Sequence, residues 1–383
     1  MRDKRLDVLR CVALLCVLVR HSFVQLRIAT AGWVGVDLFF VLSGFLISGL
    51  LFGEYRRRGS ISFKRFIVRR WFKLYPAFCV FLGATFCVES LTGRPSSTRQ
   101  YLSEILYFQN YGKPIWNHTW SLAVEEHFYL LLPIFLLVLI RFSANRADPF
   151  RMVPGVFLLV AVICLAFRVV TVLRIPLADL PDWGAYRKVL IPTHERIDSL
   201  FFGVTLGYLH HFRPDILARA LGPKNNRVIA AALSVLLLLP CLLLPPGNRF
   251  MLTAGLTMLY LGFGIILMLS LRSQVVVPAR FVGVVSGLTS ALAFVGVYSY
   301  SIYLWHGAVQ PWGAEFLRRW FHVQVHGVPL VASYFLISVS LGIAMSRLVE
   351  YPCLRLRDHL FPEIQIRSDR PAQAEILVST RLP

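Results

Sequence analysis

The chain has 383 residues, of which 56% are hydrophobic and 16% are charged. Soluble globular domains are about 45–50% apolar and about a quarter charged, so this composition excludes a soluble enzyme, a disordered protein and a fibrous repeat. A membrane protein remains, with room for about ten helices of about 20 residues each. The net charge of +20 is better explained by loops that orient the helices and meet anionic headgroups than by nucleic-acid binding.

Ten apolar stretches are predicted to cross the membrane as an all-α bundle. In chain order they are 6–24, 33–52, 71–91, 120–140, 152–173, 200–212, 228–244, 251–271, 297–316 and 328–350. The sixth stretch is short, which leaves open a half-buried helix or one that begins earlier, near residue 191. The Gly- and Ser-rich stretch 275–295 is left open between an eleventh span, a re-entrant segment and an interfacial one.

Basic residues between the spans set the expected orientation. The connection 53–73 contains eight of them beside the acid Glu54: Arg56, Arg57, Arg58, Lys64, Arg65, Arg69, Arg70 and Lys73. Short loops rich in Lys and Arg stay in the cytoplasm. We therefore expect both termini inside and the loops 93–119 and 174–198 outside. Residues 1–352 are predicted to form the membrane domain, and 353–383 a polar cytoplasmic tail without fixed structure.

The seven cysteines lie mostly within apolar runs and show neither Cys-x-x-Cys nor Cys/His spacing. Neither a disulfide framework nor a metal site is predicted from them. No small-residue cleavage motif follows the first apolar stretch, so we also expect no removable signal peptide.

Arg10 and His21 are ionisable residues in the first predicted span, and such residues indicate function because their burial in lipid is costly. They are eleven positions apart, or about three turns, so they share one helix face. Arg10 is expected near the cytoplasmic edge and His21 near the far edge. The structural alternative is that Arg10 extends to the headgroups and that His21 ends the helix at the interface.

The next motifs have structural explanations as well as functional ones. Asp37 could anchor the second span, and Ser43 with Gly44 would allow another backbone to approach closely. The basic residues Arg69, Arg70 and Lys73 are either positive-inside anchors or a clamp for phosphate groups.

The fourth span begins with Trp120 and Ser121 and soon carries the adjacent carboxylates Glu125 and Glu126, followed by His127. Packing does not explain two acids at this depth. A carboxylate hydrogen-bonded to an imidazole raises its basicity, which general-base catalysis requires. We therefore interpret this segment as functional, at a depth in the membrane similar to that of His21.

Two later segments add candidates. Arg196 and Asp198 precede the sixth span. Tyr303 and His306 are three residues apart in the ninth span and so share a face. These two residues are either part of an interfacial aromatic belt or part of the site.

Together these motifs resemble the acyltransferase-3 family of bacterial membrane O-acyltransferases. The resemblance runs from about residue 3 to residue 352. It is carried by Arg10 with His21, GVDLFFVLSGFLI at 35–47, RRWFKLYP at 69–76, TWSLAVEEHFYLLLP at 119–133 and YSYSIYLWH at 298–306. The chain departs from the family in having Lys73 at the second arginine of Arg-x-x-Arg, and His127 where glutamine is usual. An appended hydrolase-like domain is not expected.

The resemblance implies transfer of an acyl group, most commonly acetyl, from cytoplasmic acetyl-CoA to a hydroxyl of an extracytoplasmic glycan or lipid-linked saccharide. It implies a multi-pass protein of the bacterial inner membrane, in contact with lipids and without a metal or nucleic acid. His21 would be the general base or would itself accept the acyl group, and Glu125 would orient it, with Glu126 as second choice. The remaining assignments are Arg10, Arg69, Arg70 and Lys73 for the CoA phosphates, and Asp37, Ser43, Trp120, Ser121, Glu126, Arg196, Tyr303 and His306 for acceptor binding or support.

Two alternatives stay open on the sequence. Intramembrane Arg, His and Glu also suit a proton-coupled transporter of a sugar or small solute, although no inverted repeat is visible. The same fold could use succinyl-CoA as donor. The oligomeric state is not predicted.

Overall fold

The computed structural model describes residues 3–22, 24, 27–143, 148–180, 182–272, 282–313 and 327–361, and these contain helices and no strand. The long helices are α1 (Lys4–His21), α3 (Gly35–Arg58), α4 (Phe63–Thr92), α6 (Trp120–Phe142), α7 (Val153–Leu173), α9 (Thr193–Phe212), α11 (Lys224–Leu243), α12 (Leu256–Arg272), α13 (Val282–Val297) and α16 (Val328–Met345). The shorter ones are α2 (Arg27–Thr30), η1 (Ala31–Val34), α5 (Thr98–Ile105), η2 (Gln109–Tyr111), η3 (Asn117–Thr119), α8 (Trp183–Leu190), α10 (Pro214–Leu221), η4 (Met251–Gly255), α14 (Ser299–Ala308), η6 (Val309–Gly313), η7 (Ser346–Glu350) and α17 (Tyr351–Leu360).

Fewer helices qualify as membrane spans than the ten predicted. In the described part of the chain, seven are long and apolar enough, and α13 with α14, bent by 67°, makes an eighth if the pair is one span. The helices α1 and α9 fall outside this set because they carry several charged residues. The count of ten is therefore not confirmed. The sixth predicted helix does begin earlier, at Thr193.

Local sequence signals explain where α3 and α4 end. Gly59 follows α3 with φ of +68° and donates its N–H to the carbonyl of Tyr55, a geometry that glycine adopts at little cost. Ser62 caps the start of α4 by accepting the N–H of Arg65, and Gly93 ends it, again with φ of +68°. Since α4 begins at Phe63, the basic segment predicted to precede the third span is helical. Its side chains therefore lie on a fixed helix face.

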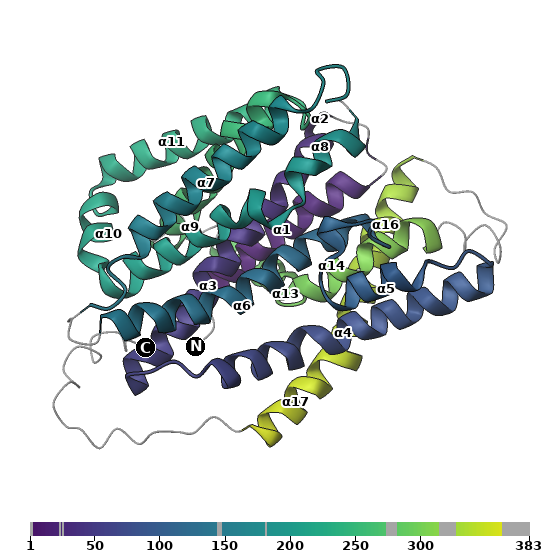
Figure 1. The fold of residues 1–383 in the computed structure, drawn as a ribbon, viewed down its shortest axis with the longest axis horizontal. Helices are drawn as coiled ribbons and strands as arrows, with labels where there is room; N and C mark the ends of the chain where they lie inside the picture. Colours follow the sequence, from purple (N-terminus) through teal and green to yellow (C-terminus); the bar gives the residue numbers. More distant parts are fainter. Residues whose placement is uncertain are drawn as a thin grey trace.

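The core of the bundle is built around α3. Figure 1 shows α1 running through the middle, with α7 and α11 on one side and α4 on the other. Helix α3 packs closely on α9 because glycines meet there. A Cβ placed on Gly44 would lie 2.0 Å from the Leu200 carbonyl oxygen, and one on Gly203 would lie 2.3 Å from that of Val41. The expected close approach at Gly44 is confirmed.

The last helix, α17, occupies the first part of the segment predicted as a tail without fixed structure. It covers residues 351–360, and Asp358 on it forms an ion pair with Arg69 of α4 at 3.8 Å. Residues 362–383 lie outside the described residues.

Glu104 organises the segment between α4 and α6. Its side chain is fully buried, and its Oε1 accepts hydrogen bonds from the N–H of Ile115 at 2.9 Å, the hydroxyl of Thr119 at 3.2 Å and the N–H of Trp116 at 3.5 Å. Burial raises the pKa of this carboxyl to about 7, although the hydrogen bonds oppose the shift. One carboxyl group thereby bonds the residues just before η3 and the last residue of η3, and so fixes the start of α6.

We expect the thermal stability of the protein in detergent to fall as the pH rises from about 4.5 to about 7. The pKa of Glu104 is about 7 in the folded protein against an ordinary 4.5. The folded state therefore binds this proton more tightly, and raising the pH through that window removes stability, by about 3 kcal/mol at most. Thermal midpoints across this pH range check it. Glu104→Gln, which keeps the accepting oxygen, should flatten the dependence; equal slopes in both proteins would contradict it.

Candidate active site

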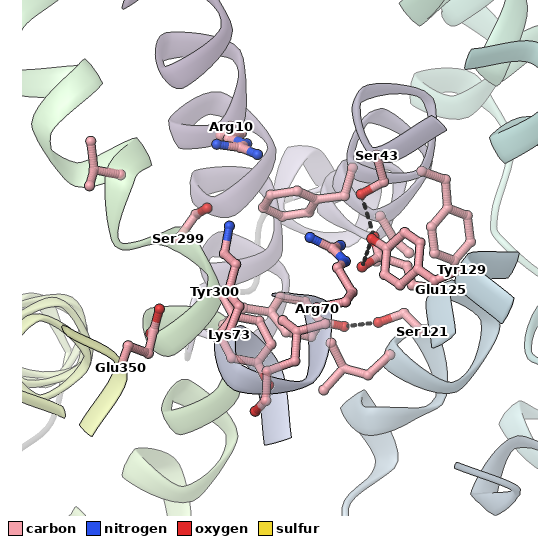
Figure 2. A pocket seen from close by; sticks show the side chains of 17 residues that line it. Arg10, Ser43, Arg70, Lys73, Ser121, Glu125, Tyr129, Ser299, Tyr300 and Glu350 are labelled. Carbon is pink, nitrogen blue, oxygen red and sulfur yellow. Dashed lines mark hydrogen bonds between the residues drawn. The ribbon is translucent and has the colours of Figure 1, made fainter. Parts of the chain in front are cut away.

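Two cavities in the described part of the bundle are lined by predicted site residues. The first, which we call the Arg10 cavity, has a volume of about 100 Å³ and is lined by α1, α3, α4, α6, α13, α14 and η7. Figure 2 shows Arg10, Arg70 and Lys73 pointing into it. The carboxylates of Glu125 and Glu350 line it as well, so the three cationic side chains leave the lining with an excess of one positive charge. This favours an elongated ligand with anionic groups at one end.

Glu125 is the acidic centre of the Arg10 cavity. Its Oε1 accepts a hydrogen bond from the Ser43 hydroxyl at 2.7 Å, and its Oε2 accepts one from the Tyr129 hydroxyl at 2.9 Å (Figure 2). The Arg70 guanidinium lies 3.9 Å from the centre of the Tyr129 ring. Residues from α3, α4 and α6 are thereby tied together at one point.

Arg69, the fourth residue of the predicted clamp, lies elsewhere. It does not line the Arg10 cavity and instead faces Asp358 on α17. Adjacent helical residues point about 100° apart, so only one of Arg69 and Arg70 can face the cavity. Arg70 and Lys73, three residues apart, share the inward face.

The second space, which we call the His21 cavity, is larger, at about 750 Å³. Its lining includes four tryptophans and, among the polar residues, two arginines and two histidines: Trp33, Trp116, Trp120, Trp183, Arg20, Arg196, His21 and His118. Val36 and Tyr303 line both cavities. The Tyr303 hydroxyl bonds the Ser121 hydroxyl at 2.6 Å and the His118 carbonyl at 2.9 Å. Tyr303 is therefore held in place as part of the wall between the two cavities.

His21 ends α1 at the His21 cavity. Its Nδ1 lies 3.0 Å from the Val17 carbonyl oxygen. A carbonyl only accepts hydrogen bonds, so Nδ1 carries the proton and Nε2 has the lone pair of a base. The resemblance implied that Glu125 orients His21. In the structure the hydrogen bonds of Glu125 go to Ser43 and Tyr129, and the tautomer of His21 is set by the Val17 carbonyl of its own helix.

His118 was missed by the sequence reasoning, although it directly precedes the TWSL motif. It is buried on η3, and its ring centroid lies 4.8 Å from that of His306 on α14, which in turn lies 5.0 Å from that of His21. His306 is fully buried. The position of His118 directly before the TWSL motif, at the start of a predicted span, was the signal in the sequence that could have identified it.

Arg196 is held by a buried ion pair. Its Nη2 lies 2.6 Å from Oδ1 of Asp37, and both side chains are buried. A second buried pair joins Arg168 of α7 to Asp198, two residues after Arg196 on α9, at 2.7 Å. The sequence reasoning named Asp37 as an anchor of the second span. The structure instead pairs it with Arg196. Arg168 was not singled out, although a charge within a predicted span should have drawn notice.

Glu126 and His127 line neither of the two cavities. Oε1 of Glu126 is buried without a hydrogen-bond partner among the described residues, and Nδ1 of His127 bonds the Thr193 hydroxyl at 2.7 Å. No group of three or more His, Cys, Asp or Glu side chains in the described ranges is arranged to hold a metal ion.

Comparison with known proteins shows the family to which the chain belongs. Residues 3–347 match the acyltransferase-3 family, described as an acyltransferase domain. The chain belongs to this family. The peptidoglycan O-acetyltransferase of Listeria monocytogenes is 29% identical over 321 residues, which cover 79% of this chain and 48% of that protein. A Staphylococcus aureus protein provisionally named an O-acetyltransferase is 29% identical over 363 residues, 90% of this chain and 55% of that protein.

A Bacillus subtilis protein provisionally named a peptidoglycan O-acetyltransferase is 30% identical over 322 residues, 79% of this chain and 47% of that protein. The chain thus spans about half the length of the curated relatives it matches. No solved structure matches it.

We expect Asp37→Asn to lower the stability of the protein strongly, because it leaves the buried charge of Arg196 unpaired, at a cost of about 3–5 kcal/mol. The double variant Asp37→Asn with Arg196→Gln should lose less than the sum of the single variants. Thermal unfolding in detergent measures both. The exposed pair Asp215 and Arg219 supplies the control, since Asp215→Asn should change stability by less than about 1 kcal/mol. Equal effects of the two aspartate substitutions would contradict the assignment.

Proposed function

We propose that this protein is a membrane O-acyltransferase that moves an acetyl group from acetyl-CoA to a hydroxyl of a glycan or lipid-linked saccharide. The observation that carries the proposal is the pair of cavities meeting at Val36 and Tyr303. One is narrow and lined by three cationic side chains and two carboxylates, and the other is wide, aromatic and contains His21. Membership of the acyltransferase-3 family and relatives named for peptidoglycan O-acetylation support the same reaction.

The donor would use the Arg10 cavity. At about 100 Å³ it holds a slender chain and not a nucleotide, so the pantetheine arm enters while the nucleotide stays at the mouth. Arg10, Arg70 and Lys73 would attract the phosphate groups, since guanidinium and ammonium groups bind phosphate by charge-assisted hydrogen bonds. Arg69 is left out of this clamp because it faces Asp358.

The acceptor would use the His21 cavity. Its tryptophans offer flat apolar rings with an N–H at the edge, which suit the faces and hydroxyls of a sugar ring. Arg196, whose guanidinium lies 5.6 Å from the centre of the Trp120 ring, would contact the acceptor. Asp37 would support Arg196, and Ser121 with Tyr303 would shape the wall beside the reacting groups.

His21 would act where the two ligands meet. Its Nε2 takes the proton of the acceptor hydroxyl while that oxygen attacks the thioester carbonyl. The carbon–oxygen bond forms, the carbon–sulfur bond breaks, and the proton passes to the CoA thiolate. In an alternative scheme, His21 itself attacks the thioester, carries the acyl group and then passes it to the acceptor hydroxyl. Glu125 would balance the charge of Arg70 and hold Ser43 and Tyr129 at the donor, and Glu126 would add negative charge near Arg70.

The orientation follows from the basic residues around the connection between α3 and α4. Lys and Arg gather on the cytoplasmic side, so we place that end and both termini in the cytoplasm of a bacterial cell and the protein in its inner membrane. The mouth of the Arg10 cavity would then open toward the cytoplasm, where CoA thioesters are made, and the His21 cavity would open outside.

We expect His21→Ala to reduce acetyl transfer by at least about a hundredfold, the contribution typical of a general base, while the protein still folds. Purified protein in detergent is given labelled acetyl-CoA and peptidoglycan fragments, and both ester formation and CoA thiol release are measured. The control is His359→Ala, an exposed residue in the last turn of α17. Near-normal transfer by His21→Ala would refute the mechanism.

Arg70→Ala should raise the KM for acetyl-CoA by about tenfold or more, because one charge-assisted hydrogen bond is lost. Arg69→Ala is the matched control: it removes the same side chain one position away on α4 and should leave the KM unchanged. The two variants are compared in initial-rate measurements at varied acetyl-CoA. Equal effects of both substitutions would contradict the assignment of Arg70 to the donor.

A further inference from the structure

Three histidines from distant parts of the chain meet beside the wall between the cavities. His21 ends α1, His118 lies on η3 and His306 lies on α14. The ring centroids of His21 and His306 are 5.0 Å apart, and those of His118 and His306 are 4.8 Å apart, in edge-on arrangements. His306 is therefore in contact with both other rings. We call these three residues the histidine cluster.

A main-chain carbonyl fixes the tautomer of each ring. His21 donates from Nδ1 to Val17, His118 donates from Nε2 to Leu304 at 3.1 Å, and His306 donates from Nδ1 to Tyr303. Because a carbonyl cannot donate, the opposite nitrogen of each neutral ring carries a lone pair. The cluster therefore holds three basic nitrogens: Nε2 of His21, Nδ1 of His118 and Nε2 of His306.

Nε2 of His306 stands out among them. It is buried, and it has no hydrogen-bond partner among the residues that the structure describes. A buried polar atom without a partner costs stability. Because the His306 ring also contacts the proposed base His21, we interpret this nitrogen as a group that takes part in the reaction.

The partners of the three rings among the described residues are main-chain carbonyls, which cannot take up a proton. In the described part of the chain no carboxylate is hydrogen-bonded to any of the three rings. The charged or titratable groups that face the cluster are Arg20 next to His21 on α1, Tyr303 on α14 and Arg196 across the His21 cavity. From α4, Phe81 contacts the His118 ring. Among the described residues, His306 contacts His21 and His118 contacts His306, so these two imidazoles are the neighbouring bases for a proton taken up by His21.

We propose that His118 and His306 are positioning residues that share with His21 the proton released by the acceptor hydroxyl. This inference rests on the proposed acyl transfer. The hydroxyl O–H bond breaks, the ester carbon–oxygen bond forms and the thioester carbon–sulfur bond breaks. The proton arrives on Nε2 of His21, is shared with the lone pairs of His306 and His118, and ends on the CoA sulfur.

Two substitutions remove one lone pair each and keep the hydrogen bond to the carbonyl. In His306→Asn the side-chain amide takes the place of Nδ1–H and still reaches the Tyr303 carbonyl. In His118→Gln the amide takes the place of Nε2–H and still reaches the Leu304 carbonyl. The variants lie on separate elements, so either one carries the test if the other does not fold, as checked by thermal unfolding. Substrate binding is followed separately, by calorimetry with acetyl-CoA.

We expect each variant to lose about tenfold in kcat, at the low end of general acid–base effects, with the KM for donor and acceptor unchanged. The acid limb of the kcat/KM profile should move to lower pH by about one unit, the coupling at which two sites titrate as a pair, because a shared proton is held more tightly than an unshared one. An acid limb that stays in place or moves to higher pH, or a loss confined to KM, would overturn the proposal.

Failure of the proposed function gives a different result. If the unaltered protein binds acetyl-CoA but transfers no acetyl group, the acyl-transfer assignment fails before the histidine cluster is tested. If the unaltered protein is active, the outcome depends on the variants alone. His127→Gln, a histidine on α6 whose ring faces Thr193 rather than the cluster, is the matched control and should leave the pH profile unchanged.

Discussion

The structure depends on one constraint: polar side chains inside an apolar bundle find few water molecules and must be satisfied by other protein groups. Asp37 with Arg196 and Arg168 with Asp198 meet it by ion pairing, and Glu125 meets it through the hydroxyls of Ser43 and Tyr129. These contacts join α3, α6, α7 and α9. The polar groups that define the site are therefore also the groups that fix the rotation of these helices about their axes.

Close packing brings the helices near enough for these contacts. Gly44 and Gly203 remove the side-chain layer between α3 and α9, so Asp37 and Arg196 reach each other from adjacent backbones. The same rigid group carries one wall of both cavities. In the proposed function, donor and acceptor would approach from opposite ends of this frame and meet at Tyr303 and His21, so that an acyl group would cross the membrane without either substrate moving through it.

Much of the site could be predicted because it is local. Arg10 and His21 share a helix face by periodicity alone, and both line cavities. The start of α4 was placed too late, because its first turns are rich in charge and resemble a loop. That error hid the fact that Arg69 and Arg70 point in different directions. His118 was missed since its meaning depends on His306, far away in the chain.

The sequence by itself determined that the chain forms membrane helices, where the ionisable residues interrupt them and which motifs place it beside the acyltransferases. Hydropathy and helical periodicity are properties of neighbouring residues, so the chain reveals them without folding. Only the tertiary structure decided that Glu125 bonds Ser43 and Tyr129, that Arg70 and not Arg69 faces a cavity, and that three histidines meet. Those contacts depend on how each helix is rotated and how deeply it sits against its neighbours, which packing between distant segments sets.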